Sequence, residues 1–117
     1  MTKITLHTKT SFDAAHKLDE YIGKCSQLHG HTWTVEVWIK GEVEHRDKAG
    51  ILFDFNKVKD LVKRLDHEYL NSVLGFNPTA ENLVLFFYAE LKNKNPFFEF
   101  KVRVFESKNS YAEIGDF

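Results

Sequence analysis

The first third of the chain alternates between apolar and polar positions, a pattern typical of β-strands with one buried face. Over residues 3–11, Ile4 and Leu6 lie on the face opposite to Lys3. Over residues 31–41 the alternation is stronger, and its apolar face is the series Trp33, Val35, Val37 and Ile39. The pattern predicts two half-buried, antiparallel strands joined by a polar connection.

Two helices are expected next. Asp54 is placed to cap the first, whose apolar residues recur at i, i+3, i+4 and i+7. We expect this helix to end near residues 67–70. Thr79 is the expected N-cap of the second helix, where Glu81 favours the positive helix start. The polar stretch 93–96, which ends in proline, should terminate it.

Alternation returns at the end of the chain, where residues 98–104 and 111–117 predict a third and a fourth strand. The order strand, strand, helix, helix, strand, strand predicts a two-layer α+β fold: a four-stranded antiparallel sheet with two helices on one face. We expect one domain over residues 1–117. The other face carries aromatic residues such as Trp38, so we expect further copies of the chain to cover it.

The composition limits the possible partners. The 16 basic and 17 acidic residues give a formal charge of -1, and no run of lysine or arginine could track phosphates, which argues against a nucleic-acid partner. Residues 1–7 lack the apolar core of a signal peptide, and no segment reaches the ~20 apolar residues of a membrane span. We therefore expect no membrane partner and a cytoplasmic location.

Histidines dominate the candidate chemistry. His29 and His31 flank Gly30, and in an extended chain they lie on one face. His16, at the expected end of the first strand, is a third candidate. Three neutral histidines are the usual ligands of a catalytic zinc ion, whose fourth position holds water or substrate. Polar residues flanking loops would be the ordinary alternative.

The single cysteine, Cys25, lies close to this motif. A lone cysteine in an intracellular enzyme that also has histidines is a candidate nucleophile or base, although an isolated cysteine is more often a small buried hydrophobe. The polar neighbours of Cys25 argue against burial. The sequence leaves open whether Cys25 binds the metal, which would close a four-ligand site, or works beside it.

Acidic residues supply further candidates. By strand parity Glu106 lies on the apolar face of the third strand, where an unpaired carboxylate would be costly, so a ligand with two N–H donors could pair with it. A bulge that returns Glu106 to solvent, or a salt bridge to lysine or arginine, would explain it equally well. Asp66 and His67 close the first predicted helix and suit proton transfer, or are simply a polar helix end.

Six motifs occur in an order that resembles the 6-pyruvoyl-tetrahydropterin synthase superfamily: Phe12-Asp13-Ala14-Ala15-His16, the C-x3-H-G-H of 25–31, Gly50-Ile51-Leu52-Phe53-Asp54-Phe55, Leu65-Asp66-His67, Pro78-Thr79-Ala80-Glu81-Asn82 and Val102-Arg103-Val104-Phe105-Glu106. The spacing of three residues between the cysteine and H-G-H resembles that of the 6-carboxytetrahydropterin synthases of the queuosine pathway. This resemblance implies the tunnelling fold, in which three chains close their sheets into a barrel and two trimers stack into a hexamer.

The resemblance also assigns roles, residue by residue. It implies that His16, His29 and His31 bind Zn2+, that Cys25 is the general base, and that Asp66 and His67 handle protons. It makes Glu106 the anchor of the pterin ring, with the neighbouring contacts Thr79, Ala80 and Glu81. The family often has threonine where this chain has Ser107 and Ala80, which affects only the secondary contacts.

The activity that the resemblance implies is conversion of 7,8-dihydroneopterin triphosphate to 6-carboxy-5,6,7,8-tetrahydropterin, with release of acetaldehyde and triphosphate. Formation of the pyruvoyl product and aldolase cleavage of the pterin side chain are alternatives on the same scaffold. A noncatalytic zinc protein, with Cys25 and three histidines closing the site, is the alternative from another class.

Overall fold

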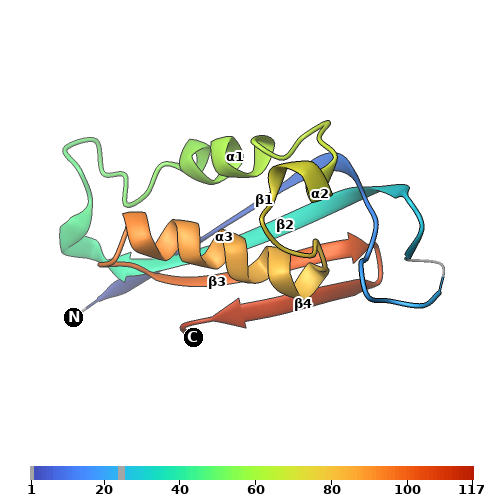
Figure 1. Ribbon diagram of the computed structural model, residues 1–117. Helices are drawn as coiled ribbons and strands as arrows, with labels where there is room; N and C mark the ends of the chain where they lie inside the picture. The colour runs from blue at the N-terminus through green and yellow to red at the C-terminus, as the bar shows by residue number, and fades with distance from the viewer. Residues whose placement is uncertain (1, 24–25) are drawn as a thin grey trace.

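The computed structural model describes residues 2–23 and 26–117. Their strands form one antiparallel sheet in which the order in space is the order in the chain. The strands are β1 (Lys3–His16), β2 (His29–Glu42), β3 (Glu99–Ser107) and β4 (Ser110–Gly115). The long β1 and β2 extend beyond the shorter pair at one end, as Figure 1 shows. The predicted four-stranded antiparallel sheet is confirmed.

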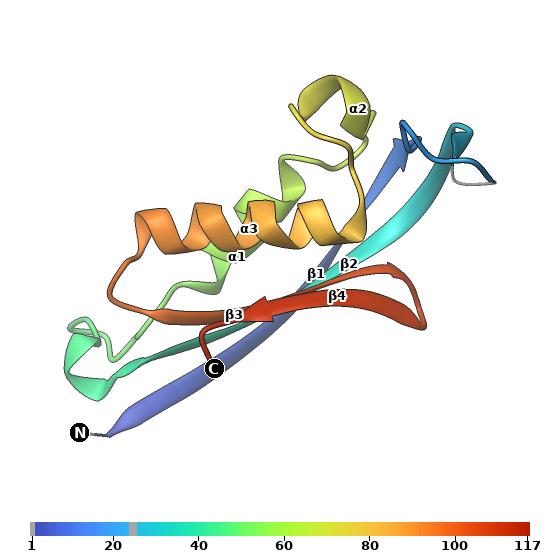
Figure 2. The ribbon, with the colours of Figure 1, turned by 60° about the horizontal axis from the view of Figure 1, so that its bottom comes forward.

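The helices lie on one face of this sheet, as Figure 2 shows. They are α1 (Phe55–Lys63), α2 (Leu70–Val73) and α3 (Ala80–Lys94), and a 3-10 turn, η2 (Val43–His45), follows β2. The predicted two-layer α+β architecture is therefore confirmed, with α2 as a short helix that the sequence pattern did not indicate. None of the helices described is long and apolar enough to cross a membrane.

The core lies between the helices and the sheet, because every second residue of each long strand points to the helices. On β2 these are Trp33, Val35, Val37 and Ile39, all 0% exposed. The opposite face is open in the single chain and carries Trp38, whose ring lies 5.0 Å from Lys101 Nζ and 4.7 Å from Arg103 Cζ. Coverage of this face by further copies stays a prediction.

Both predicted helix starts are confirmed. Asp54 accepts a hydrogen bond from the Asn56 backbone N–H at 2.9 Å, and the Thr79 hydroxyl accepts one from the Asn82 N–H at 3.0 Å. Each bond satisfies a backbone donor that the first helical turn leaves unpaired. The α3 helix therefore begins at Ala80, directly after its cap Thr79. The bond from His16 to the Pro78 carbonyl places this first turn at the end of the sheet that carries the histidines.

The predicted end of the first helix is wrong: α1 ends at Lys63, before the stretch 67–70. After α1, the carboxylate of Asp66 and the backbone of His67 bind β1, and the helix does not continue. Asp66 Oδ1 accepts from the Asp13 N–H at 2.9 Å, and the His67 N–H donates to the Asp13 carbonyl at 2.7 Å. These bonds hold the chain against the outer edge of β1, and His67 adopts a left-handed φ of 60°.

Candidate metal and ligand site

The structure brings together the three histidines selected from the sequence. In the β1–β2 register His16 lies directly opposite His29, and Ala14 lies opposite His31. Because side chains on a strand alternate, all three imidazoles point to the helix side of the sheet. Their ring centroids are 4.5–5.0 Å apart, and each ring places a nitrogen within 4.8 Å of the others.

Backbone carbonyls fix two of the three tautomers. His16 Nδ1 is 2.7 Å from the Pro78 carbonyl oxygen, and His29 Nδ1 is 2.7 Å from that of Gln27. A carbonyl oxygen can only accept, so both Nδ1 atoms must carry the proton. In the neutral rings each Nε2 is then left with a lone pair.

These lone pairs face one another in a part-buried place. The Nε2 atoms of His16 and His29 are 3.1 Å apart, and His31 Nε2 is buried without a hydrogen-bond partner among the described residues. Burial lowers the pKa of His16 and of His31, and nearby imidazoles lower both further, which disfavours protonation as a way of relieving the repulsion.

A cation between the rings would satisfy all three nitrogens. Two imidazoles bound to a tetrahedral zinc ion through Zn–N bonds of ~2.05 Å place their nitrogens about 3.3 Å apart, close to the spacing of His16 and His29. The donor set of His16, His29 and His31 therefore fits a zinc ion.

Glu106 lies beside this cluster. Its Oε2 atom is 3.8 Å from His16 Nε2, and its side chain is 31% exposed. A shift in the β3–β4 register leaves Glu106 without a cross-strand partner, as the bulge alternative proposed, but the carboxylate remains on the histidine side. No lysine or arginine within the described chain pairs with it.

Glu106 also lines a cavity of about 330 Å³ together with Ala80 and Glu81 at the start of α3, and with Ser110, Tyr111 and Ala112 of β4. Two of the three predicted neighbouring contacts thus share a cavity with Glu106. The Thr79 hydroxyl instead caps α3. The carboxylate and the histidine nitrogens could therefore contact different parts of one ligand.

Asp66 and His67 belong to a second cluster. His67 Nδ1 is 3.0 Å from Asp66 Oδ2, an arrangement that the turn after α1 allows and a continued helix would not. The hydrogen bond from the Asp13 N–H, followed by the charge of His67, lowers the pKa of Asp66. Asp13 in turn accepts from the Thr32 hydroxyl at 2.6 Å.

Within one chain the two clusters are separate groups of ligand atoms, but they border the same cavity. His67 is 81% exposed and lines an open cavity of about 570 Å³ with Asp13 and Thr32, and His31 of the three-histidine cluster lines it too. Among the described residues, His67 belongs to the group of Asp13 and Asp66 and not to the group of the three histidines. Cys25 lies outside the described residues, so its position relative to either cluster stays a prediction.

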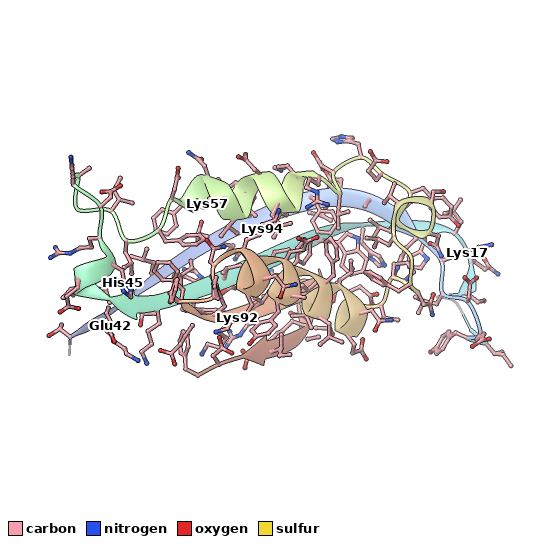
Figure 3. The ribbon with its side chains drawn as sticks, turned by 60° about the vertical axis from the view of Figure 1, so that its left-hand side comes forward. Lys17, Glu42, His45, Lys57, Lys92 and Lys94 are labelled. Carbon is pink, nitrogen blue, oxygen red and sulfur yellow. The ribbon has the colours of Figure 1, made fainter. Side chains whose placement is uncertain are left out.

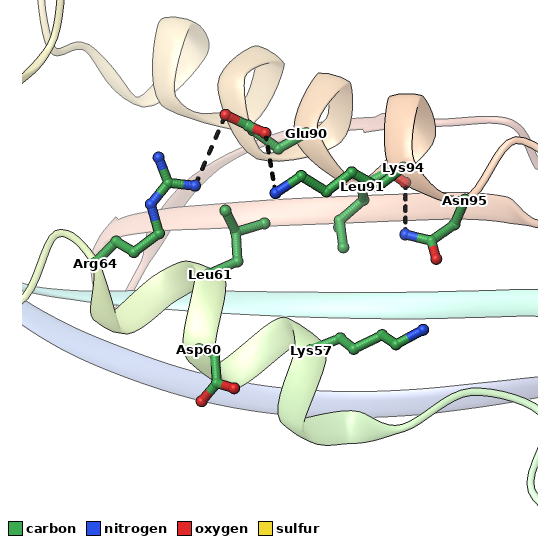
Figure 4. A pocket seen from close by; sticks show the side chains of 8 residues that line it. All are labelled: Lys57, Asp60, Leu61, Arg64, Glu90, Leu91, Lys94 and Asn95. Atoms are coloured by element: carbon green, nitrogen blue, oxygen red, sulfur yellow. Dashed lines mark hydrogen bonds and ion pairs between the residues drawn. The ribbon is translucent and has the colours of Figure 1, made fainter.

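A further cavity, of about 500 Å³, lies between α1 and α3. Figure 4 shows Leu61 and Leu91 facing each other across it, with Glu90 bridging Arg64 at 3.8 Å and Lys94 at 3.9 Å. None of the residues selected from the sequence lines it.

Sequence reasoning missed the groups that orient the histidines and the acid. Pro78 acts through its backbone carbonyl, which has no side-chain signature. Asp13 and Thr32 form a hydrogen bond that depends on strand register. Their positions beside predicted ligands could have raised them as candidates, but not shown their partners.

Comparison with known proteins gives consistent results. A family model described as 6-pyruvoyl tetrahydropterin synthase matches residues 5–116. A relative from Archaeoglobus fulgidus whose description carries the name 6-carboxy-5,6,7,8-tetrahydropterin synthase is 38% identical over 106 residues, 90% of each chain. Further relatives carry that name. The dihydroneopterin monophosphate aldolase of Pyrococcus furiosus is 39% identical over 94 residues, 75% of each chain.

Among solved structures, the 6-pyruvoyl tetrahydropterin synthase of Caenorhabditis elegans matches with a TM-score of 0.78 and 26% identity. The match covers 100% of this chain and 98% of the other. The sheet, the helices and their order are thus shared over the whole length.

Proposed function

This chain belongs to the 6-pyruvoyl tetrahydropterin synthase family, and we propose that within it the protein converts 7,8-dihydroneopterin triphosphate and one water molecule to 6-carboxy-5,6,7,8-tetrahydropterin, acetaldehyde and triphosphate. The names of its relatives confirm the prediction of an enzyme, a pterin lyase. The single observation that carries the proposed chemistry is the convergence of three histidine nitrogens, two with fixed tautomers, around the buried His16.

His16, His29 and His31 would hold Zn2+, which supplies a Lewis acid that lowers the pKa of the hydroxyl groups on the substrate side chain. The chain itself contributes the orientation. Carbonyls of Pro78 and Gln27 keep both Nδ1 protons in place, so the Nε2 atoms face the ion without rearrangement. The fourth position is left for substrate, provided that Cys25 is not a ligand.

Glu106 would bind the amino-pyrimidinone edge of the pterin through two charge-assisted hydrogen bonds. The distance of 3.8 Å between Glu106 Oε2 and His16 Nε2 supports a single site for the pterin ring and the substrate side chain. Cys25 as thiolate would remove a proton from the side chain, and His67 would return protons, with its Nδ1 held by Asp66.

Because His67 does not join the three-histidine group within one described chain, we propose a site to which two copies contribute. In that arrangement His67 of one copy faces the histidines and Cys25 of another. It agrees with the hexamer, a dimer of trimers, that the family resemblance implies. We propose this assembly, a cytoplasmic location and a role in the queuosine pathway as parts of the same function.

Product analysis tests the reaction. Purified protein is incubated with 7,8-dihydroneopterin triphosphate, and chromatography follows the pterin while coupled assays follow acetaldehyde and triphosphate. The proposal requires the carboxylated pterin and equal amounts of the two other products. A pyruvoyl product as the main species would overturn it.

Aldolase activity is a second candidate because the Pyrococcus furiosus relative of that name is 39% identical to this chain. Such an enzyme would leave 6-hydroxymethyl-7,8-dihydropterin. Parallel reactions with the mono- and triphosphate of dihydroneopterin distinguish the synthase from the aldolase, because only the aldolase hypothesis predicts the hydroxymethyl product.

The role of Cys25 is tested separately from the product. Zinc X-ray absorption of the protein without substrate should show nitrogen and oxygen near ~2.0 Å and no sulfur at ~2.3 Å. The substitution Cys25→Ala should abolish turnover while zinc stays bound. Loss of zinc from this variant, or a zinc–sulfur distance, would place Cys25 in the ligand set and favour a closed, noncatalytic site.

A further inference from the structure

The end of β1 that carries His16 is held by two asparagine side chains. Asn71 accepts a hydrogen bond from the Lys17 N–H at 2.9 Å and donates one to the Lys17 carbonyl at 2.9 Å. Asn77 makes the same pair of bonds with Asp19, both at 3.1 Å. Each amide thus takes the place of a neighbouring strand for one residue, and the chain beyond His16 stays fixed where the sheet has ended.

Asn77 is also joined directly to the residue that orients His16. Its own carbonyl accepts from Asn82 Nδ2 at 2.9 Å, and Asn82 belongs to the first turn of α3. The next residue is Pro78, whose carbonyl binds His16 Nδ1 at 2.7 Å. The short stretch 77–78 is therefore fixed from three directions: by the Asp19 backbone, by α3 and by His16.

The effect of this fixation falls on one imidazole. His16 is 0% exposed, and the Pro78 carbonyl is the only partner of its Nδ1 among the described residues. If this carbonyl turned away, the proton could move to Nε2, and that tautomer cannot bind a metal through Nε2. Groups that orient the outer nitrogen of a ligating histidine commonly change metal affinity by 10–100-fold.

We propose that Asn77 is a positioning residue of the zinc site, acting through Pro78 and Asp19 to keep His16 in the metal-binding tautomer. Its described side-chain hydrogen bonds go to the Asp19 backbone and not to the three histidines or Glu106. The inference rests on the proposed metal site and goes beyond it, because neither the family resemblance nor the arrangement of the three histidines assigns any role to Asn77. Asn82 supports it by holding the Asn77 carbonyl.

The chain offers a matched control at the other end of the same helix. Asn95 donates from Nδ2 to the Leu91 carbonyl at 2.9 Å and is the C-cap of α3. Like Asn77 it is half-buried and bonded to backbone, but no described contact links it to the histidines. A purely structural contribution of an asparagine should therefore appear equally in Asn77→Ala and Asn95→Ala.

The experiment measures zinc dissociation constants of the full-length protein by competition with a chromogenic chelator, and melting temperatures of the metal-free forms. Both alanine variants should lower the melting temperature by a few degrees. Zinc binding should weaken by about 10–100-fold in Asn77→Ala and stay within twofold of the parent in Asn95→Ala. Equal zinc affinity in the two variants would overturn the proposal.

If Asn77→Ala folds poorly, a second variant and an NMR measurement still test the proposal. Asn77→Asp keeps the acceptor for the Asp19 N–H and loses the donor to its carbonyl, so it should also weaken zinc binding. Nitrogen-15 NMR of the metal-free protein, at a pH where the imidazoles are neutral, should show the His16 proton on Nδ1 in the parent and partly on Nε2 in the variant. An unchanged tautomer together with unchanged zinc affinity contradicts the proposal, whereas a parent protein without zinc affinity contradicts the metal site itself.

Discussion

The histidine cluster and the cavity between α1 and α3 differ in how their polar groups are partnered and exposed. The cavity is large, about 500 Å³, but its charged groups are partnered or solvated: Glu90 faces both Arg64 and Lys94, which are 55% and 70% exposed. In the cluster His16 is 0% exposed, His29 and His31 are half-buried, and His31 Nε2 is unsatisfied within the described chain. The volume of a cavity therefore does not by itself identify the ligand site.

The difference shows what a ligand site needs in physical terms. A buried nitrogen without a partner costs free energy that a bound group can recover, whereas exposed charges in water lose little when no ligand is present. At the histidine end, backbone carbonyls orient two of the side chains, whereas no carbonyl of the described residues binds a charged side chain of the cavity between α1 and α3. Metal and ligand binding should therefore respond strongly to substitutions in the histidine cluster and weakly to substitutions in the cavity between α1 and α3.

The largest effect is expected for His16→Ala. Loss of one of three ligands, together with an unpaired Pro78 carbonyl, should remove stoichiometric zinc from the purified protein. His45→Ala is the matched control, because His45 lies at the far end of the sheet from Lys17, as Figure 3 shows. Metal content by mass spectrometry measures both. One zinc per chain in His16→Ala would contradict the assigned ligand set.

Glu106→Gln should weaken binding of a pterin by about tenfold or more, since a charge-assisted hydrogen bond is worth about 1.5–3 kcal/mol. The same substitution at Glu90, in the cavity between the helices, is the control and should leave affinity unchanged. Fluorescence titration with a dihydropterin measures both constants. Equal affinities in the two variants would mean that Glu106 is not the anchor.

Acid should destabilise the metal-free protein in a defined window. Because burial lowers the pKa of His16 and His31, the folded protein keeps them neutral, while the unfolded chain takes up protons near pH 6.5. The free energy of unfolding should be full above about pH 6.5 and fall as the pH decreases through that value toward the lowered pKa values. Urea unfolding between pH 8 and 5 measures it, and a His31→Leu variant should show a smaller slope. A slope that is the same in this variant would exclude a contribution from His31.

The smallest effect is expected between the two helices. Removing the Arg64–Glu90 pair by alanine substitution should change the free energy of unfolding by less than about 1 kcal/mol, because Arg64 is 55% exposed and the N–O distance is 3.8 Å. A double-mutant cycle in urea isolates the pair. Zinc content should be unaffected, and a loss of zinc in Arg64→Ala would remove the contrast between the two regions.

The sheet could be predicted because its signal is periodic. Trp33 to Ile39 alternate cleanly, and the same parity places His29 and His31 on the helix side. The caps Asp54 and Thr79 are equally local, since each side chain binds a backbone group two or three residues away. Interactions between such close neighbours can be predicted from a few consecutive residues.

The end of α1 and the orienting groups could not be predicted in this way. Asp66 leaves the helix for a partner 53 residues earlier in the chain, Asp13, and nothing near Asp66 announces that choice. The tautomer of His16 depends on a main-chain oxygen of Pro78. Such features become visible only when distant segments meet.

The contact between His16 and Pro78, which are 62 positions apart, has a consequence for the order of folding events. The three imidazoles sit on one β-hairpin and can gather once β1 and β2 pair. The final orientation of His16 waits for the slower closure of a long loop that brings the start of α3 to the sheet. Zinc should therefore bind loosely to the early hairpin and tightly only to the completed fold, so that the tightness of metal binding reports how far folding has progressed.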